Sequence, residues 1–231
     1  MARRTVIVGL CALLLAAPAP AAAEDDLWDR TISLVSANPI RMPGTVHTRM
    51  ETLDRHGAVK VVEDYWAEMS LGPDGEPVSA LVRAEKDGVD ITEKAQRQGK
   101  KREGRGFELG PESSPFLPEN QEQVTVTPRE GLEEIDGRRC QGFDLVLTTD
   151  QTTYRGIAWI DELNAVPRRY EFTAEPMPPM VQQMQMVLTY RPLHTGGWIS
   201  EQMVVEGVGG ALMVKKRFRV TITFDDHFVV D

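Results

Sequence analysis

The sequence predicts a mainly β protein of the α+β class, built as an antiparallel meander. Within residues 142–172, apolar and polar residues alternate with the period of strands that have two unlike faces. Polar breaks at 150–152 and 161–164 divide this stretch into three consecutive strands. Similar runs recur on both sides of it, so we expect about ten or eleven strands that curl into a strongly twisted sheet or partial barrel.

The first 23 residues predict a secretory signal peptide. Two arginines precede an apolar run over residues 5–16, and Ala21–Ala23 provide an A-x-A motif, which places cleavage after Ala23. The run is too short for a membrane span. Lipidation of Cys11 is the alternative, which bulky Leu10 disfavours. We therefore expect a periplasmic product with a single domain over residues 24–231.

Charge and cysteine content limit the partners of this chain. The net charge is −9, and removal of the leader with its two arginines lowers it to −11. Such a charge argues against nucleic acid as a partner. No second apolar run reaches membrane-spanning length, so we do not expect an integral membrane protein. Cys140 is the only cysteine after cleavage; we interpret it as buried or inert, with a reactive thiol or an intermolecular bridge as alternatives.

Residues 24–38 predict an amphipathic helix that ends just before Pro39. The acidic residues at its start suit a helix N-terminus. Leu27, Thr31, Leu34 and Val35 fall on one face. That face must pack on something apolar, and the sheet is the candidate.

The next segment predicts a hairpin and a further strand. Residues 44–53 and 58–70 are strand-like and flank a turn that contains Gly57, and residues 78–84 follow as the next strand. Asp90 or Thr92 is placed to cap a short helix.

Three segments between the predicted strands have little apolar periodicity. Residues 99–106 are basic and interrupted by glycine, which predicts an exposed hinge, with docking of an anionic group as the alternative. Residues 107–118 predict an irregular connection before a short strand at 124–127. Residues 173–180 contain three prolines, which prevent regular pairing, and two methionines, which give an adaptable apolar surface. Strands are then expected at 184–190, 198–205 and 213–224.

No motif in the chain specifies a reaction. His47, His56, His194 and His227 are not spaced as a pair on one element, so we expect no metal, no cofactor and no catalytic residue. Residues 225–227 have metal-binding residue types without a companion motif and are interpreted as a polar strand end. An enzyme that acts through its carboxylates is the alternative, since the spacing between acidic groups is not fixed by the sequence.

Several segments together carry a resemblance to a known family. The first is Asp136-Gly137 together with the strand-like residues 142–150 that follow it. The second is 156–172, which contains a strand, an acidic turn and a strand that begins with Pro-Arg. The others are the strand-like runs at 186–193 and 217–227. The chain resembles periplasmic proteins of the outer-membrane lipoprotein-sorting type, the superfamily that includes LolA, LolB and RseB. This resemblance implies an antiparallel, unclosed half-barrel whose open side is covered by helices, with an apolar cavity that accepts acyl chains.

The resemblance favours a non-enzymatic periplasmic carrier or binding protein for lipoprotein acyl chains or another hydrophobic ligand, with a membrane transporter as a potential partner. The alternative is an envelope sensor that binds another protein through an open sheet edge. Ordinary core packing is the competing interpretation of every candidate residue. The candidates for the cavity are Trp159, Tyr170, Phe172, Met177, Met180, Met184 and Met186, with Leu27, Leu34 and Val35 on the helix side.

Overall fold

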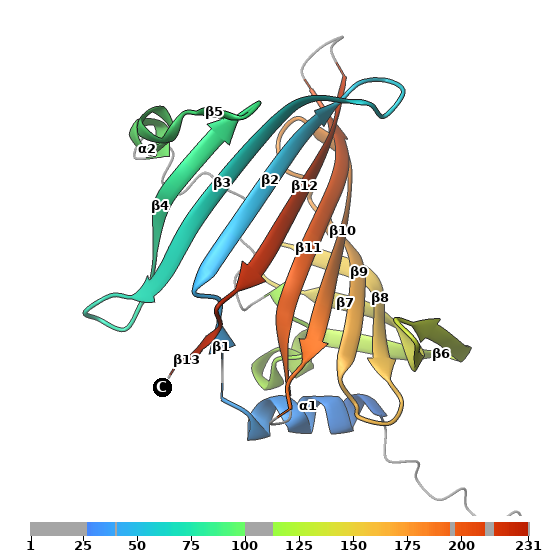
Figure 1. Cartoon of the computed structure of the whole chain (residues 1–231). Coiled ribbons are helices and arrows are strands. Elements are labelled where there is room, and N and C mark those ends of the chain that lie inside the picture. Colours follow the sequence, from blue (N-terminus) through green and yellow to red (C-terminus); the bar gives the residue numbers. More distant parts are fainter. Residues whose placement is uncertain (1–26, 40, 100–112, 195–196, 211–214, 231) are drawn as a thin grey trace, which may run out of the picture.

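The computed structural model describes residues 27–39, 41–99, 113–194, 197–210 and 215–230 (Figure 1). The predicted signal peptide and residues 100–106 of the predicted basic loop lie outside these ranges. The helical segments are α1 (Leu27–Ala37), α2 (Thr92–Gly99) and the 3-10 helix η2 (Pro118–Gln123). The strands are β1 (Arg41–Met42), β2 (Thr45–Leu53), β3 (Val59–Leu71), β4 (Pro77–Lys86), β5 (Val89–Asp90), β6 (Val124–Ile135), β7 (Arg138–Thr148), β8 (Thr153–Asp161), β9 (Pro167–Glu175), β10 (Val181–Pro192), β11 (Trp198–Gly209), β12 (Lys216–Asp225) and β13 (Phe228–Val229).

Eleven of these strands form one antiparallel sheet, which confirms the predicted fold class. Their order is β5-β4-β3-β2-β12-β11-β10-β9-β8-β7-β6, while β1 and β13 pair separately. The pairing of β2 with β12 joins the N-terminal strands to the C-terminal meander, and the sheet is not closed because its end strands β5 and β6 do not pair with each other. The sheet therefore curves without becoming a barrel (Figure 1).

The sequence-based prediction did not contain the two-residue strands β1, β5 and β13, and three further elements differ from it. β6 continues eight residues beyond Thr127 to Ile135. It tolerates Pro128 because it is an edge strand, and the pairing shifts between Pro128 and Leu132 around Gly131, whose φ is 80°. β9 runs to Glu175, so the predicted irregular segment 173–180 begins only at Pro176. The 3-10 helix η2 was not predicted.

The core lies on one face of the sheet, which we call the inner face. It fills the space between strands β6–β12 and the helical segments α1 and η2. Trp28 of α1 packs with its ring centroid 5.5 Å from that of Phe116 and 5.7 Å from that of Phe143. The buried members of this cluster are Trp28, Phe116, Phe143, Leu145, Leu147, Tyr154, Ala158, Ile160, Tyr170, Phe172, Ala174, Met184, Met186, Tyr190, Met203 and Val205. The predicted amphipathic helix thus does lie on the sheet.

Thr31 fixes α1 to the turn between β8 and β9. Its side chain is fully buried, and its hydroxyl oxygen lies 2.9 Å from the carbonyl oxygens of both Leu27 and Ala165. The single hydroxyl proton can be donated to either carbonyl, and only the bond to Ala165 connects the helix to the sheet. Arg30 reinforces this end by donating to the carbonyl of Leu163 at 3.1 Å.

We expect Thr31→Val to lower the free energy of unfolding by about 1–3 kcal/mol, because it leaves the Ala165 carbonyl buried without this donor. Urea denaturation followed by circular dichroism measures the change. Ser33→Ala is the matched control, since Ser33 donates to the carbonyl four residues earlier but is exposed. Equal losses in the two variants would show that the cross-link to the sheet is not the stabilising contact.

Candidate ligand-binding site

A pocket of about 130 Å³ opens at the C-terminal end of α1. Leu34 and Val35 of α1 form one wall, and Trp198 at the start of β11 forms another. The remaining lining residues are Asn38, Pro39, Arg41, Ser114, Phe116, Leu117 and Gly197. The pocket is therefore mainly apolar, with a few polar groups and one cation.

Phe116 separates this pocket from the core. It is buried and meets Tyr190 and Trp198 edge-on, with ring centroids 5.7 Å and 6.0 Å away. The chain around it is held by side-chain amides: Asn120 donates to the carbonyl of Ser114 at 2.7 Å, and Gln121 donates to that of Pro115 at 2.8 Å. Trp28 in turn donates from its indole to Gln121 at 2.9 Å. These bonds position the Phe116 wall against α1.

The structure brings only part of the predicted cavity together. Leu34 and Val35 line the pocket. Leu27 and Val35 pack on the core cluster. The candidates on β9 and β10 lie on the inner face beneath the helix but are closely packed, with at most 7% exposure; they are Tyr170, Phe172, Met184 and Met186. These four side chains therefore form the floor of the core rather than the wall of an open cavity.

Trp159 lies on the other face of the sheet. Its neighbour Ala158 belongs to the main core, and adjacent residues of a strand point to opposite faces. Trp159 instead packs with Ile135 and Cys140 in a small second cluster. Trp159 cannot share one cavity with Tyr170, so its predicted place in the cavity is wrong. The alternation of residues on β8 already assigned Trp159 to the opposite face from Ala158.

Met177 and Met180 lie at the far end of β10 from the pocket. The segment that holds them precedes Val181, which pairs with Gly209, whereas Pro192 at the other end of β10 pairs with Trp198. Twelve residues of strand separate the two ends, about 40 Å at ~3.3 Å per residue. Met177 packs on the core, while Met180 is 68% exposed. The structure thus gives Met180 an open apolar surface remote from α1.

The inner face extends beyond the packed core. Phe218, Val220, Ile222 and Phe224 of β12 pack on the main cluster but are only partly buried. No residue of β2 or β3 belongs to this cluster within the described chain. Met50, opposite Val220, is 42% exposed. The apolar inner surface therefore continues onto β2 without being covered by the core.

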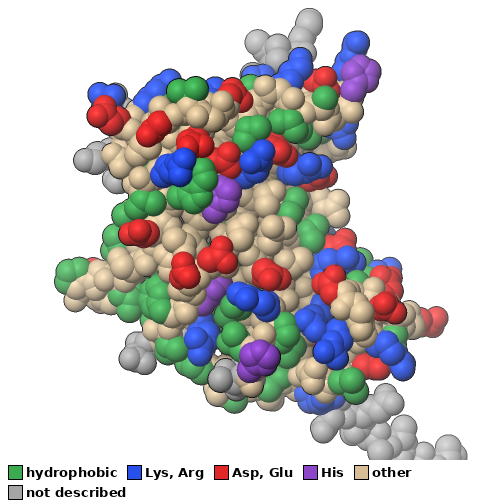
Figure 2. Space-filling model, in the orientation of Figure 1, with side chains coloured by type: hydrophobic (Ala, Val, Ile, Leu, Met, Phe, Trp, Pro, Cys, Tyr) green, Lys and Arg blue, Asp and Glu red, His purple; other side chains and the backbone are tan. Residues whose placement is uncertain are grey.

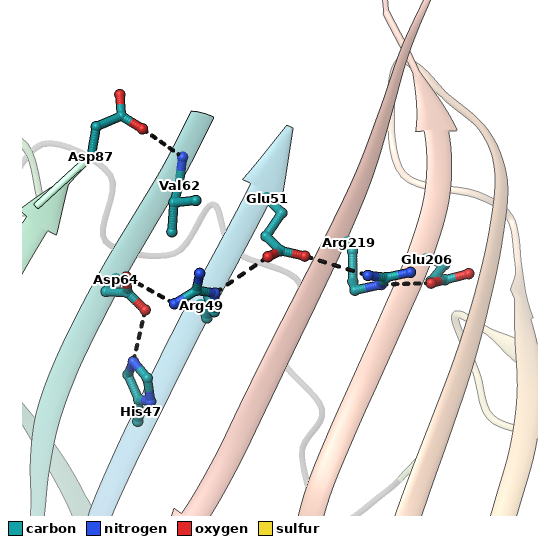
Figure 3. Close-up of polar contacts among 8 residues, drawn as sticks. All are labelled: His47, Arg49, Glu51, Val62, Asp64, Asp87, Glu206 and Arg219. Atoms are coloured by element: carbon teal, nitrogen blue, oxygen red, sulfur yellow. Dashed lines mark hydrogen bonds and ion pairs between the residues drawn. The ribbon is translucent and has the colours of Figure 1, made fainter. Parts of the chain in front are cut away.

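The outer face of β3, β2, β12 and β11 has a different character, because alternating charges cross it (Figure 3). Arg49 lies 3.6 Å from Asp64 and 3.3 Å from Glu51. Arg219 lies 3.5 Å from Glu51 and donates to Glu206 at 2.7 Å, and this hydrogen bond raises the pKa of Arg219. The charges are mutually paired, so the row is better suited to joining strands than to binding an ion.

His47 closes one end of this row. Its Nε2 lies 2.9 Å from a carboxylate oxygen of Asp64, and its ring stacks on Trp66 with centroids 4.7 Å apart. The guanidinium of Arg83 lies 4.9 Å from the same indole ring. Trp66 is thus sandwiched between two side chains. On the face seen in Figure 2, acidic and basic groups are interspersed rather than gathered into patches of one sign.

Cys140 is the free cysteine among the described residues. Burial raises the pKa of the Cys140 thiol to about 11, and Cys140 is free and buried, which agrees with the interpretation of an inert thiol. No cluster of three metal-ligating side chains occurs within the described ranges. Among those same residues, no helix is long and apolar enough to cross a membrane.

The Tyr170 hydroxyl is the most unusual polar group of the inner face. Its side chain is 1% exposed, and the oxygen has no hydrogen-bond partner in the described part of the protein. Burial raises the pKa of Tyr170 far above its usual value, so the hydroxyl stays protonated. An unpaired buried hydroxyl normally destabilises a protein.

We expect Tyr170→Phe to stabilise the protein by up to about 1–2 kcal/mol, because it removes a buried polar atom without changing the ring. Urea denaturation of the purified protein measures this. A loss of stability instead would show that the hydroxyl has a partner, such as an ordered water molecule.

The similarity of this chain to known proteins is limited to solved structures. No protein-family model and no curated protein matches the chain. Solved structures similar to it include an outer membrane lipoprotein-sorting protein domain from Vibrio parahaemolyticus, with 10% identity, a TM-score of 0.40, and coverage of 87% of this chain and 91% of that one. A DUF1329 family protein from Desulfovibrio piger has 13% identity, a TM-score of 0.36, and coverage of 88% and 91%. The MucA/MucB complex of Pseudomonas aeruginosa has 10% identity, a TM-score of 0.25, and coverage of 89% and 98%.

Proposed function

We propose that this protein is a non-enzymatic periplasmic binding protein that holds the apolar part of a lipid, a lipoprotein acyl chain or a similar ligand on the inner face of its open sheet. The pocket beside α1 carries the proposal. It is walled by Leu34, Val35 and Trp198, and Arg41 of β1 also lines it. The uncovered inner surface around Met50 gives a longer ligand further apolar contact.

The volume of the pocket limits the binding free energy that the pocket can provide by itself. A volume of 130 Å³ is below the ~300–1,000 Å³ of typical ligand pockets, and holds about four groups of water size at ~30 Å³ each. Four buried methylenes contribute about 3 kcal/mol, at ~0.8 kcal/mol each. Micromolar affinity needs about 8 kcal/mol. A ligand of that affinity must therefore extend beyond the pocket or move the Phe116 wall aside.

The first test is native mass spectrometry of mature protein purified from the periplasm without detergent, followed by solvent extraction. A co-purified lipid or lipopeptide supports the proposal and identifies the cargo class. A ligand-free mass, together with no uptake of fluorescent fatty acids in titration, would overturn it.

We expect Leu34→Asn to weaken the binding of a fluorescent medium-chain fatty acid at least about 5-fold, since it places an amide in the apolar wall and loses roughly 1–2 kcal/mol of apolar contact. Leu163→Asn is the matched control, because Leu163 is 72% exposed on the turn at the other end of α1. Fluorescence titration gives both affinities. Equal affinities of the two variants would argue against the pocket as the binding site.

A second function is favoured by the surface of β3–β5. Among the described residues, half of the ten large exposed hydrophobic side chains lie there: Val59, Leu71, Val78, Val82 and Val89. β5 pairs with β4 only at Glu85 and Lys86. The segment after β5 covers a further part of this edge, because Gln96 donates to the carbonyl of Leu81 and the amide of Ala84 donates to Thr92. An envelope protein could add a strand to the remaining part, residues 77–80. A photocrosslinker at Val78, compared with one at exposed Glu130 on β6, tests this in intact cells; equal crosslinking patterns would argue against it.

A further inference from the structure

Arg41 is the charged residue that lines the pocket beside α1. The other described lining residues are apolar or neutral. Arg41 belongs to β1, where it pairs with Val229, and its side chain is partly buried. No ion pair joins it to an acidic side chain within the described part of the chain, although the protein as a whole carries a net charge of −9.

His227 is a titratable group that feels the charge of both Arg41 and Arg191. His227 lies close to both Arg191 and Arg41; burial has the largest effect in lowering the pKa of His227, and the two arginines lower it further. Asp225 opposes them by raising it. Arg191 has a partner in Glu201, 3.7 Å away, whereas Arg41 has none among the described residues. Among the described residues, Arg41 is thus a cation without an ion pair at an apolar pocket.

An arginine beside an apolar pocket matches a particular kind of ligand. Guanidinium groups bind carboxylates through two parallel hydrogen bonds. A neutral acyl ester or alcohol offers no charge to this group. A phosphate monoester carries about −1.5 to −2 charges, which one guanidinium only partly neutralises. One cation therefore matches one carboxylate, and the short apolar pocket matches the first few methylenes of its chain.

We propose that the pocket binds a fatty carboxylate, with the carboxylate on Arg41 and the chain between Leu34 and Trp198. This inference rests on the proposed function and adds the class of head group. It assigns a role to Arg41, which no sequence pattern distinguishes from the other arginines of the chain.

Isothermal titration of delipidated full-length mature protein with octanoate, 1-octanol, octylamine and octyl phosphate at pH 7.5 tests the inference. We expect octanoate to bind at least 10-fold more tightly than 1-octanol or octylamine, and more tightly than octyl phosphate. Arg41→Gln should weaken octanoate at least 5-fold and change 1-octanol by less than 2-fold, while Arg41→Lys should fall between. Arg155→Gln is the matched control, because Arg155 is exposed on β8 and has no ion pair among the described residues.

The outcomes separate the two proposals. Equal binding of octanoate and 1-octanol, or equal loss of both in Arg41→Gln, would overturn the carboxylate site while the hydrophobic-ligand function remains. Tighter binding of octyl phosphate would assign the head group to a phosphate and overturn the carboxylate. Failure of all four ligands to bind, with no lipid recovered from the native protein, would overturn both proposals.

Discussion

The packing of Phe116 is the interaction on which the organisation of the inner face depends. Its ring meets those of Trp28, Tyr170, Tyr190 and Trp198 at centroid distances of 5.5 to 6.4 Å. It thereby connects α1 with three neighbouring strands of the sheet. Aromatic pairs of this kind contribute about 0.5–1.5 kcal/mol each beyond the area that they bury. The same ring forms a wall of the pocket, so the site and the core share one structural element.

The two halves of the sheet are stabilised by different forces. From β7 to β11 the inner face carries the buried core, and burial of apolar surface provides most of the stability there. The core ends at β12. Across β3, β2, β12 and β11 the outer-face row from Asp64 to Glu206 contributes paired charges instead. Because exposed ion pairs contribute only about 0–1 kcal/mol each, this half keeps its shape through backbone pairing more than through a core.

Much of the fold could be predicted from the sequence because it depends on local alternation. The period-two pattern of residues 142–172 located three strands, and the apolar stripe of α1 required a sheet beneath it. The pattern failed where tertiary context overrode local signals. Pro128 suggested the end of a strand, yet at an edge strand its missing N–H group costs no ladder bond. The three prolines of residues 173–180 likewise disfavoured pairing that β9 maintains to Glu175.

The candidate site was only partly predictable, for a geometric reason. Alternation assigns a residue to a face, so it placed Tyr170, Phe172 and Met186 together correctly, and it should have placed Trp159 apart from them. It cannot assign residues from separate segments to one pocket.

Arg41 lies on a two-residue strand, Phe116 in a proline-flanked connection and Trp198 at the start of β11. These short stretches show no repeat of apolar residues from which their meeting could be predicted. Their convergence follows from the bonds that position the segment around Phe116 against α1. An open sheet needs such a segment where its core ends, because the last covered side chains would otherwise face water. The segment that completes the core therefore also forms the pocket, and a binding site at this position requires no separate scaffold.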